Sequence, residues 1–289
     1  MSNRNTQANK QAARERLRAE RERQAKKDKM RRQLTVGGAI VAVLAIAGGI
    51  GVMVAKSGGD GGSGANATVK DMAGNDKAWA KAAKAKLVTP ANTSGDKGTT
   101  LVIGKADAKH TLELFEDPRC PGCANFEQNV GETVQKDIKD GKYKARFHLA
   151  TFLDNNLRGT GSKNALSALG SALNVSPDAF LKYKEALYSK EFHPDETGPD
   201  KFADDNYLIE VADTVPALKG NKNFEKAVKS GVYDRWALEM SVEFNSHKDV
   251  NNTPTLKLDG KEIGIQSGPN KVAPSTPADF NRLVDEGVK

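Results

Sequence analysis

The chain has 289 residues, a net charge of +7 and only two cysteines. Its first 33 residues carry twelve Lys or Arg against four Asp or Glu, so the positive charge lies in this tail and the rest is close to neutral. Because the tail has no aromatic residue to stack on a base, its charge does not indicate a nucleic-acid-binding protein. With two cysteines, the chain also has no additional thiol to act as an internal relay.

A hydrophobic segment follows the basic tail. Residues Leu34 to Ala55 contain no charged side chain over 22 positions, and a helix rising about 1.5 Å per residue would cross a bilayer over that length. The sequence therefore predicts a single transmembrane helix. The positive-inside rule places the tail in the cytoplasm and the rest of the chain outside. The expected contact of the basic side chains is the lipid bilayer, through its anionic head groups.

A cleaved signal peptide is the competing interpretation of this segment. Ala65, Asn66 and Ala67 form an AxA pattern. The apolar run is longer than a usual signal core, however, and the pattern begins about ten residues beyond its end. These two mismatches favour an uncleaved anchor, which would hold the protein at the cell membrane by a single pass.

The anchor leads into a spacer and one globular domain. Ser57–Thr68 is rich in Gly and Ser, which predicts a flexible linker. Lys77–Lys86 predicts a short helix that Trp79 would tether to the body. The expected organisation is a basic cytoplasmic tail at 1–33, the anchor at 34–55, a linker with a short helix at 56–97 and a globular domain at 98–289.

The first part of the domain alternates strands with one helix. Strands are predicted at Thr99–Ile103 and Thr111–Phe115, a helix runs from about Pro121 to Ile138, and a further strand covers Lys142–Phe152. This order predicts a sheet with helices packed on it.

The second part of the domain is mainly helical. From about residue 158 to 245 the pattern is helical, and capping and breaking residues divide it into about four helices. After it, Asn251–Ile263 alternates apolar positions around an Asp-Gly pair, which predicts a hairpin. Pro277–Val288 predicts a closing helix with one apolar face.

The two cysteines stand where the second strand gives way to the helix. In FEDPRCPGC, Pro118 ends the strand and Pro121 occupies the first helical position, where its missing N–H costs nothing. Cys120 then lies at a helix N-terminus, whose unpaired N–H groups and dipole favour a thiolate, and Arg119 adds a positive charge. The CxxC spacing lets both sulfurs meet across one turn. Cys120 is the expected attacking sulfur and Cys123 the resolving one.

Two other uses of a CxxC pair are less well supported. A zinc site normally needs four ligands, and the chain has no second CxxC and no histidines at paired metal-ligand spacing. Its four histidines are His110, His148, His193 and His247. A purely structural disulfide would close a loop too small to remove much chain entropy. We therefore expect a redox-active pair that needs no metal and no cofactor.

These features together resemble the DsbA-like branch of the thioredoxin fold, the membrane-anchored bacterial thiol–disulfide oxidoreductases. The resemblance rests on FEDPRCPGC, the helical segment after it and Thr253-Pro254 before the hairpin, and it covers about Thr99–Lys289. It implies an α/β thioredoxin-like fold with an all-helical insertion at about 158–245. It also implies that Pro254 is cis and lies beside the cysteines, while the backbone of Thr253 pairs with an extended substrate peptide. From the residues alone, an ordinary strand-opening proline is the alternative.

Two positions depart from the pattern of that family. Many relatives carry a buried acid six positions before the first cysteine, where this chain has Leu114. Glu113 and Glu116 are the neighbouring candidates to take a proton from the resolving thiol, and a solvated charge at a strand end is the alternative. The dipeptide between the cysteines ends in Gly122, which has no side chain to stabilise a thiolate. A weaker oxidant than the strong oxidases of the family is the expected consequence.

The expected function is an extracytoplasmic thiol–disulfide oxidoreductase that introduces disulfides into secreted or membrane proteins. Its expected partners are unfolded or thiol-containing secreted proteins and a membrane redox partner that reoxidises the pair. Two alternatives remain: a reductase or isomerase of extracytoplasmic disulfides, and a non-catalytic thioredoxin-fold module that binds extended peptides. The expected catalytic residues are Cys120 and Cys123, the substrate-binding residues Thr253 and Pro254, and the supporting residues Pro121, Gly122 and Glu116.

Overall fold

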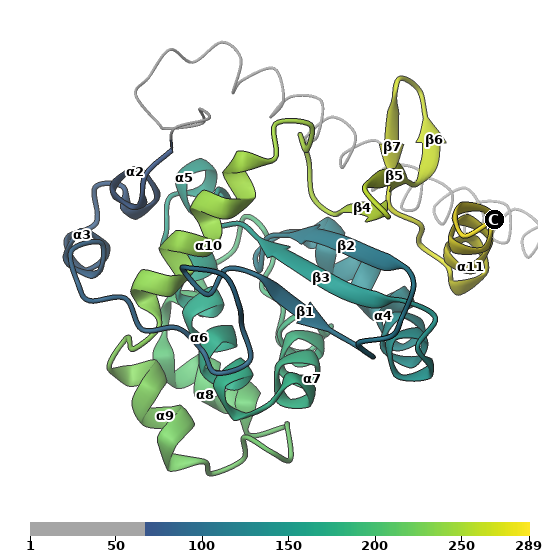
Figure 1. Ribbon diagram of the computed structural model, residues 1–289. Coiled ribbons are helices and arrows are strands. Elements are labelled where there is room, and N and C mark those ends of the chain that lie inside the picture. The colour runs from purple at the N-terminus through teal and green to yellow at the C-terminus, as the bar shows by residue number, and fades with distance from the viewer. Residues whose placement is uncertain (1–66) are drawn as a thin grey trace, which may run out of the picture. The chain divides into compact units, whose positions relative to one another are not determined.

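The computed structural model describes residues 67–289, which form a sheet flanked by helices (Figure 1). The predicted basic tail and transmembrane segment, and nearly all of the Gly/Ser spacer, lie outside the described residues. Within the described part, no helix combines the length and the apolar character needed to cross a bilayer.

A five-stranded sheet forms the centre of the domain. Its strands lie in the order β1-β3-β2-β4-β5, with β2 and β3 parallel and the other neighbours antiparallel. All four residues of β4 are buried, as expected for a strand that is covered on both faces. The bounds are β1 Leu101–Ile103, β2 Thr111–Glu116, β3 Lys144–Leu149, β4 Thr255–Leu258 and β5 Lys261–Ile263.

Helices pack on this sheet and on each other. α4 (Pro121–Asp140) begins just after β2, and α11 (Pro277–Gly287) packs beside it. Between β3 and β4 the chain forms the predicted helical insertion, whose last helix contacts β3. Its elements are α5 Leu153–Leu157, α6 Gly161–Val175, α7 Pro177–Leu187, the 3-10 helix η1 Lys201–Ala203, α8 Asp205–Ala212, α9 Lys222–Lys229 and α10 Asp234–Ser246.

The helical insertion contains one more helix than its sequence predicts. α9 and α10 are separate helices because the chain turns at Gly231, whose φ is +61°. A Cβ at this position would also clash with the carboxylate of Asp234, so both the backbone conformation and the space favour glycine. The expectation of about four helices was wrong for this reason, since five α-helices, α6 to α10, cover the segment.

β4 and β5 form the predicted hairpin. Asp259 and Gly260 occupy its turn with φ angles of 50° and 79°, as a two-residue type I′ turn requires. The Asp259 carboxylate accepts a hydrogen bond from the N–H of Thr111 at 2.8 Å, which ties the turn to the start of β2. A second hairpin, absent from the sequence prediction, follows as β6 (Ile265–Ser267) and β7 (Asn270–Val272).

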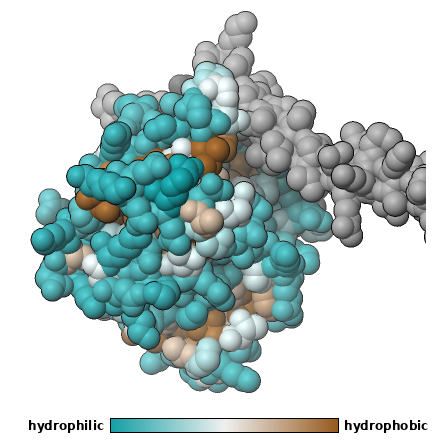
Figure 2. All heavy atoms as spheres, turned by 90° about the vertical axis from the view of Figure 1, so that its right-hand side faces the viewer, coloured by the Kyte–Doolittle hydropathy of each residue, from teal (hydrophilic) through white to brown (hydrophobic). Residues whose placement is uncertain are grey.

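The core is apolar and the surface is mainly polar. The face shown in Figure 2 is mostly hydrophilic, with hydrophobic residues gathered in a few small patches. Among the described residues, the exposed large hydrophobic side chains are Val88, Val102 and Val175. Nearly all large apolar side chains in this part of the chain are therefore buried or partly buried.

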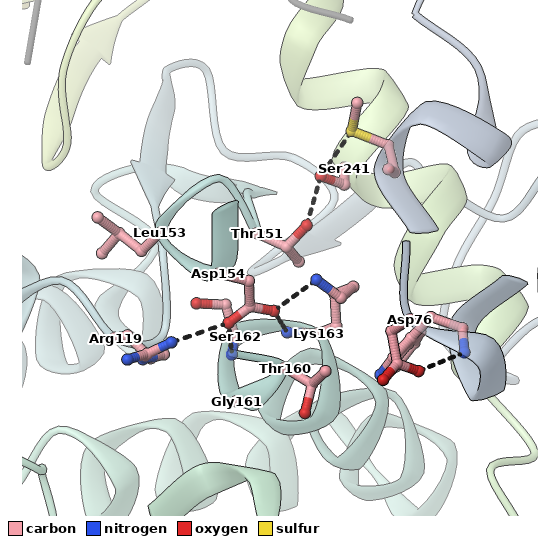
Figure 3. Close-up of polar contacts among 12 residues, drawn as sticks. Asp76, Arg119, Thr151, Leu153, Asp154, Thr160, Gly161, Ser162, Lys163 and Ser241 are labelled. Atoms are coloured by element: carbon pink, nitrogen blue, oxygen red, sulfur yellow. Dashed lines mark hydrogen bonds and ion pairs between the residues drawn. The ribbon is translucent and has the colours of Figure 1, made fainter. Parts of the chain in front are cut away.

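The segment before the domain packs onto it. α2 (Val69–Ala73) and α3 (Lys77–Ala82) contact α10, and Met72 and Trp79 are buried in the main core. The hydroxyl of Ser241 on α10 donates a hydrogen bond to the sulfur of Met72 at 3.3 Å (Figure 3). The described part of the expected linker, residues 67–97, thus has its helices anchored on the insertion.

Replacing Asp76 by alanine should loosen α3. The Asp76 carboxylate caps this helix by accepting hydrogen bonds from the N–H groups of Ala78 and Trp79 at 2.8 and 3.1 Å. Loss of such a cap costs about 1 kcal/mol, so the free energy of unfolding should fall by that amount and limited proteolysis near α3 should become faster. Asp107→Ala, at an exposed residue, is the control. Equal protease resistance of the two variants would show that the cap does not hold α3.

Candidate active site

Cys120 and Cys123 stand at the start of α4. Cys120 is the N-cap residue and Pro121 follows as the first helical residue. The sulfur of Cys120 accepts a hydrogen bond from the backbone N–H of Cys123 at 3.4 Å, and both thiols are free. Cys120 keeps 7% of its surface exposed and Cys123 none. Cys120 is therefore the accessible sulfur of the pair, although little of it reaches solvent.

The two thiols have opposite pKa shifts. The pKa of Cys120 is lowered from its ordinary value because the Cys123 side chain hydrogen-bonds to its sulfur, which outweighs burial. The pKa of Cys123 is raised well above its ordinary value, first by burial and then by the hydrogen bond to Cys120 and the nearby charges of Cys120 and Glu116. The negative charge of the reduced pair is therefore held on Cys120, at the positive end of the α4 dipole.

The loop before β4 packs against the cysteines. The Thr253–Pro254 peptide bond is cis, as the resemblance implied, and the thiol of Cys120 donates a hydrogen bond to the carbonyl oxygen of Thr253 at 3.4 Å. Gly122 faces the same loop. A Cβ at Gly122 would lie 3.1 Å from Cδ of Pro254 and 3.6 Å from Sγ of Cys120. The close approach of the two segments therefore favours glycine between the cysteines.

A buried ion cluster lies close to Cys123. Glu116, at the end of β2, is fully buried, and Nζ of Lys184 on α7 lies 3.1 Å from one of its carboxylate oxygens. The same Nζ lies 2.6 Å from a carboxylate oxygen of Glu127 on α4. Burial raises the pKa of Glu116 to about 7, although the charge of Lys184 opposes this shift. Burial alone would lower the pKa of Lys184, but the two carboxylates outweigh it and raise this pKa.

The structure separates the two acids that the sequence left as candidates. Glu116 is the one whose charge acts on Cys123, and it is buried rather than solvated. Glu113 lies on the other face of β2, where it contacts His148. No local sequence pattern marks Lys184 as buried, because a lysine on an amphipathic helix is normally assigned to the solvent face.

The loop between β2 and α4 is pinned by the helical insertion (Figure 3). The buried carboxylate of Asp154 accepts hydrogen bonds from the N–H groups of Ser162 and Lys163 at the start of α6, at 2.8 and 3.0 Å. It also lies 2.9 Å from Nζ of Lys163 and 3.2 Å from a guanidinium nitrogen of Arg119. Asp200 contacts the same guanidinium at 3.4 Å. The charge of Arg119, expected to support the thiolate, is thus paired with two carboxylates.

Asp117 and Tyr188 complete the support of this loop. The buried Asp117 carboxylate accepts hydrogen bonds from the Ser162 hydroxyl at 2.7 Å and from the N–H groups of Arg119 and Leu153 at 3.0 and 3.1 Å. The Tyr188 hydroxyl donates to the Asp117 carbonyl at 3.0 Å. Tyr188 and Leu153 also pack in one hydrophobic cluster with both cysteines. Sequence analysis missed this framework, because its members form no local motif and meet only through the fold.

Comparisons with known proteins agree with this geometry. A family model described as Thioredoxin matches residues 96–286. Disulfide bond formation protein D of Bacillus subtilis is 27% identical over 162 residues, which are 56% of this chain and 68% of that protein. The reduced disulfide bond oxidoreductase DsbG of Mycobacterium tuberculosis is similar with a TM-score of 0.51 at 26% identity, over 70% of this chain and 86% of its own. Oxidised DsbA of the same organism gives a TM-score of 0.52 at 25% identity, over 65% and 92%.

Proposed function

Because the chain belongs to the thioredoxin family and is a DsbA-like thiol–disulfide oxidoreductase, we propose that it introduces disulfides into extracytoplasmic proteins through Cys120 and Cys123. The observation that carries this direction is the position of Cys120 at the N-cap of α4, where its sulfur accepts the Cys123 N–H at 3.4 Å and its pKa is lowered. A stabilised thiolate favours the reduced form of the pair, and a pair whose reduced form is favoured is an oxidant. Gly122 has no side chain that could stabilise the Cys120 thiolate further, so we expect an oxidant of moderate strength.

In the oxidising direction the pair takes two electrons from substrate thiols. A substrate thiolate attacks Sγ of Cys120, the bond to Cys123 breaks, and Cys123 leaves as a thiolate that takes up a proton. A second substrate thiolate then attacks the substrate sulfur of the mixed disulfide and releases Cys120. The substrate loses two electrons and two protons and gains one disulfide, and the pair is left reduced. In the reverse direction Cys120 attacks a substrate disulfide and Cys123 resolves the product.

Glu116 is the proposed proton carrier for Cys123. Its protonated form gives a proton to the departing Cys123 thiolate, and its ionised form takes that proton back in the reverse step. A pKa of about 7 supports this role, because both forms are then populated near neutral pH. Lys184 keeps the ionised form accessible by pairing with it in the buried site.

The release of a trapped substrate by Cys123 should speed up as pH rises through about 7. Cys123 must lose its proton to attack the mixed disulfide, and only ionised Glu116, which predominates above its pKa of about 7, accepts it. In Glu116→Gln we expect single-turnover release to slow by on the order of 10²-fold or more and to lose this midpoint. Glu132→Gln, at an exposed position of α4, should release like the parent. An unchanged midpoint in Glu116→Gln would contradict the assignment.

Thr253 and Pro254 are the proposed substrate-binding residues, with Pro121 and Gly122 as supporting residues. Both loop residues are half-buried, and β4 begins only at Thr255, so the backbone of Thr253 lies outside the sheet ladder. An extended peptide pairing with this backbone would place its cysteine near Sγ of Cys120, which lies 3.4 Å from the Thr253 carbonyl oxygen.

The proposal includes the membrane organisation expected from the sequence. Leu34–Ala55 serves as an uncleaved anchor, the tail at 1–33 lies on the cytoplasmic side against the lipid head groups, and the globular domain at 98–289 lies outside. The length of the uncharged segment and the charge of the tail support this arrangement. Thiol-containing secreted proteins are then the substrates, and a membrane redox partner reoxidises the pair.

A redox equilibrium on the full-length chain tests the direction of electron flow. The protein is equilibrated in graded glutathione buffers, its thiols are trapped, and the oxidised fraction of Cys120 and Cys123 is read. A potential more oxidising than that of the glutathione couple supports the disulfide donor. A potential well below it supports the reductase. The absence of any exchange would contradict catalysis and favour the peptide-binding module.

A further inference from the structure

Two of the four histidines meet on the sheet face opposite to Glu116. His148 of β3 and His247, which ends α10, have ring centroids 4.5 Å apart. Glu243 lies one helical turn before His247 and contacts both rings. Sequence analysis found no paired metal-ligand spacing because His148 lies on a different element from the other two residues. The fold alone brings the three side chains together.

The three side chains direct one donor atom each toward a common point. Oε1 of Glu243 lies 2.9 Å from Nδ1 of His148 and 3.1 Å from Nε2 of His247. All three donor atoms lie within 4.8 Å of one another. In a tetrahedral zinc site, where bonds are about 2.0–2.1 Å, neighbouring donor atoms are about 3.3 Å apart. Small rotations of the side chains would therefore close this arrangement around an ion.

Packing and a second carboxylate fix the orientation of His148. Its side chain is fully buried, and its ring stacks on Phe115 with centroids 4.2 Å apart. Nε2 of His148 lies 3.3 Å from Oε1 of Glu113, which leaves Nδ1 to face Glu243 and His247. A metal-bound histidine almost always donates its other ring N–H to a carboxylate or a carbonyl group. Glu113 is placed to be that outer partner.

The charges and exposure around the cluster suit a dication. The side chains of Glu243 and His247 are 15% and 23% exposed, so the site is open to solvent. A guanidinium nitrogen of Arg146 lies 3.3 Å from Oε1 of Glu243, and the Arg146 side chain is one-third exposed. Lys257, whose charge also acts on Glu113, pairs with Asp249 at 2.7 Å. The carboxylates of Glu113, Glu243 and Asp249 thus face the cations of Arg146 and Lys257, which leaves one negative charge for a cation when the two imidazoles are neutral, as metal-bound imidazoles are.

We propose that His148, Glu243 and His247 form a binding site for a zinc ion, with Glu113 as the outer partner of His148. Two imidazoles and one carboxylate are a donor set that Zn²⁺ prefers, whereas Mg²⁺ and Ca²⁺ prefer oxygen ligands throughout. The ion would join β3 to the end of α10. The chain that leaves His247 runs to the cis peptide before Pro254, so zinc would hold the start of the segment that leads into the substrate loop.

A zinc titration of the full chain tests this site. The protein is purified without a polyhistidine tag and carries Cys120→Ser and Cys123→Ser, so that no thiolate competes for zinc. Zn²⁺ is titrated against a chromophoric chelator, and we expect one ion per chain. His247→Ala and Glu243→Gln should each weaken binding by at least about tenfold, and Glu113→Gln by about 10–100-fold. The first 66 residues contain no His or Cys and add no such ligand.

His110→Ala is the matched control, because His110 also pairs with a carboxylate, that of Asp259, at 2.7 Å. It should bind zinc like the parent. A zinc-dependent rise in melting temperature, lost in His247→Ala, provides a second measurement, and circular dichroism checks that each variant is folded. The proposal is overturned if zinc does not bind to the protein that lacks both cysteines, or if His247→Ala binds equally well. Displacement of the zinc by excess Mg²⁺ would also overturn it.

Discussion

Cys120→Ser should abolish disulfide exchange. The hydroxyl that replaces the thiol forms no disulfide with Cys123. The substitution also removes the one sulfur of the pair that reaches solvent. Loss of an attacking group costs on the order of 10³-fold or more in turnover, so we expect no oxidation of a dithiol peptide above the uncatalysed rate. The measurement is thiol trapping of the peptide over time with catalytic amounts of protein.

Cys123→Ser provides the internal control for this experiment. It keeps the Cys120 thiol but lacks the resolving sulfur, so Cys120 should attack a disulfide-bonded peptide and remain joined to it. Mass spectrometry should therefore find a stable mixed disulfide in Cys123→Ser and none in Cys120→Ser. Equal peptide binding by both variants and the parent, with no exchange in any of them, would favour the non-catalytic module.

Lys184→Met should lower the free energy of unfolding by about 3–5 kcal/mol, the usual cost of leaving buried charges without their partner. Nζ of Lys184 lies 3.1 Å from Glu116 and 2.6 Å from Glu127, and all three side chains are buried. Methionine has nearly the same volume, so the loss would come from charge and not from a cavity. Denaturant unfolding of parent and variant measures the difference.

Two further variants show whether the charge is responsible. Glu116→Gln and Glu127→Gln, added to Lys184→Met, should recover most of the lost stability, because no unpaired charge then remains buried. Lys182→Met, on the same helix but with a side chain 56% exposed and paired to Glu185, should change stability by about 1 kcal/mol or less. A Lys184→Met variant as stable as Lys182→Met would contradict the role given to the cluster.

The parts of this domain that could be predicted from sequence depend on local signals. β2, α4, the β4–β5 hairpin and α11 each carry their own pattern, cap or turn residues within a few positions, and the structure has all four. The cysteines at the start of α4 were also predictable from local sequence, because the CxxC motif and its flanking proline are adjacent in the chain. The position of Pro254 beside them came from the family resemblance and not from its neighbours.

The parts that escaped prediction are contacts between distant segments. Lys184 is 68 residues from Glu116, and His148 is 95 residues from Glu243. No sequence periodicity links residues so far apart in the chain. From the sequence alone, such lysines and histidines are therefore assigned to the solvent-exposed surface, and only the structure shows their partners. The extra division at Gly231 was missed for a different reason, since the positive φ of this glycine and the turn between α9 and α10 are properties of the fold.

Lys184 lies on α7, later in the chain than the cysteines and Glu116, and this order affects how the site forms during synthesis. Synthesis proceeds from the N-terminus, so the cysteines and Glu116 emerge before the helix that neutralises this acid. Until α7 has docked, the resolving thiol lies beside an acid without its lysine, and α6 has not yet pinned the loop before Cys120. Cys120 and Cys123 therefore reach the environment described above only after the helical insertion has folded onto the sheet.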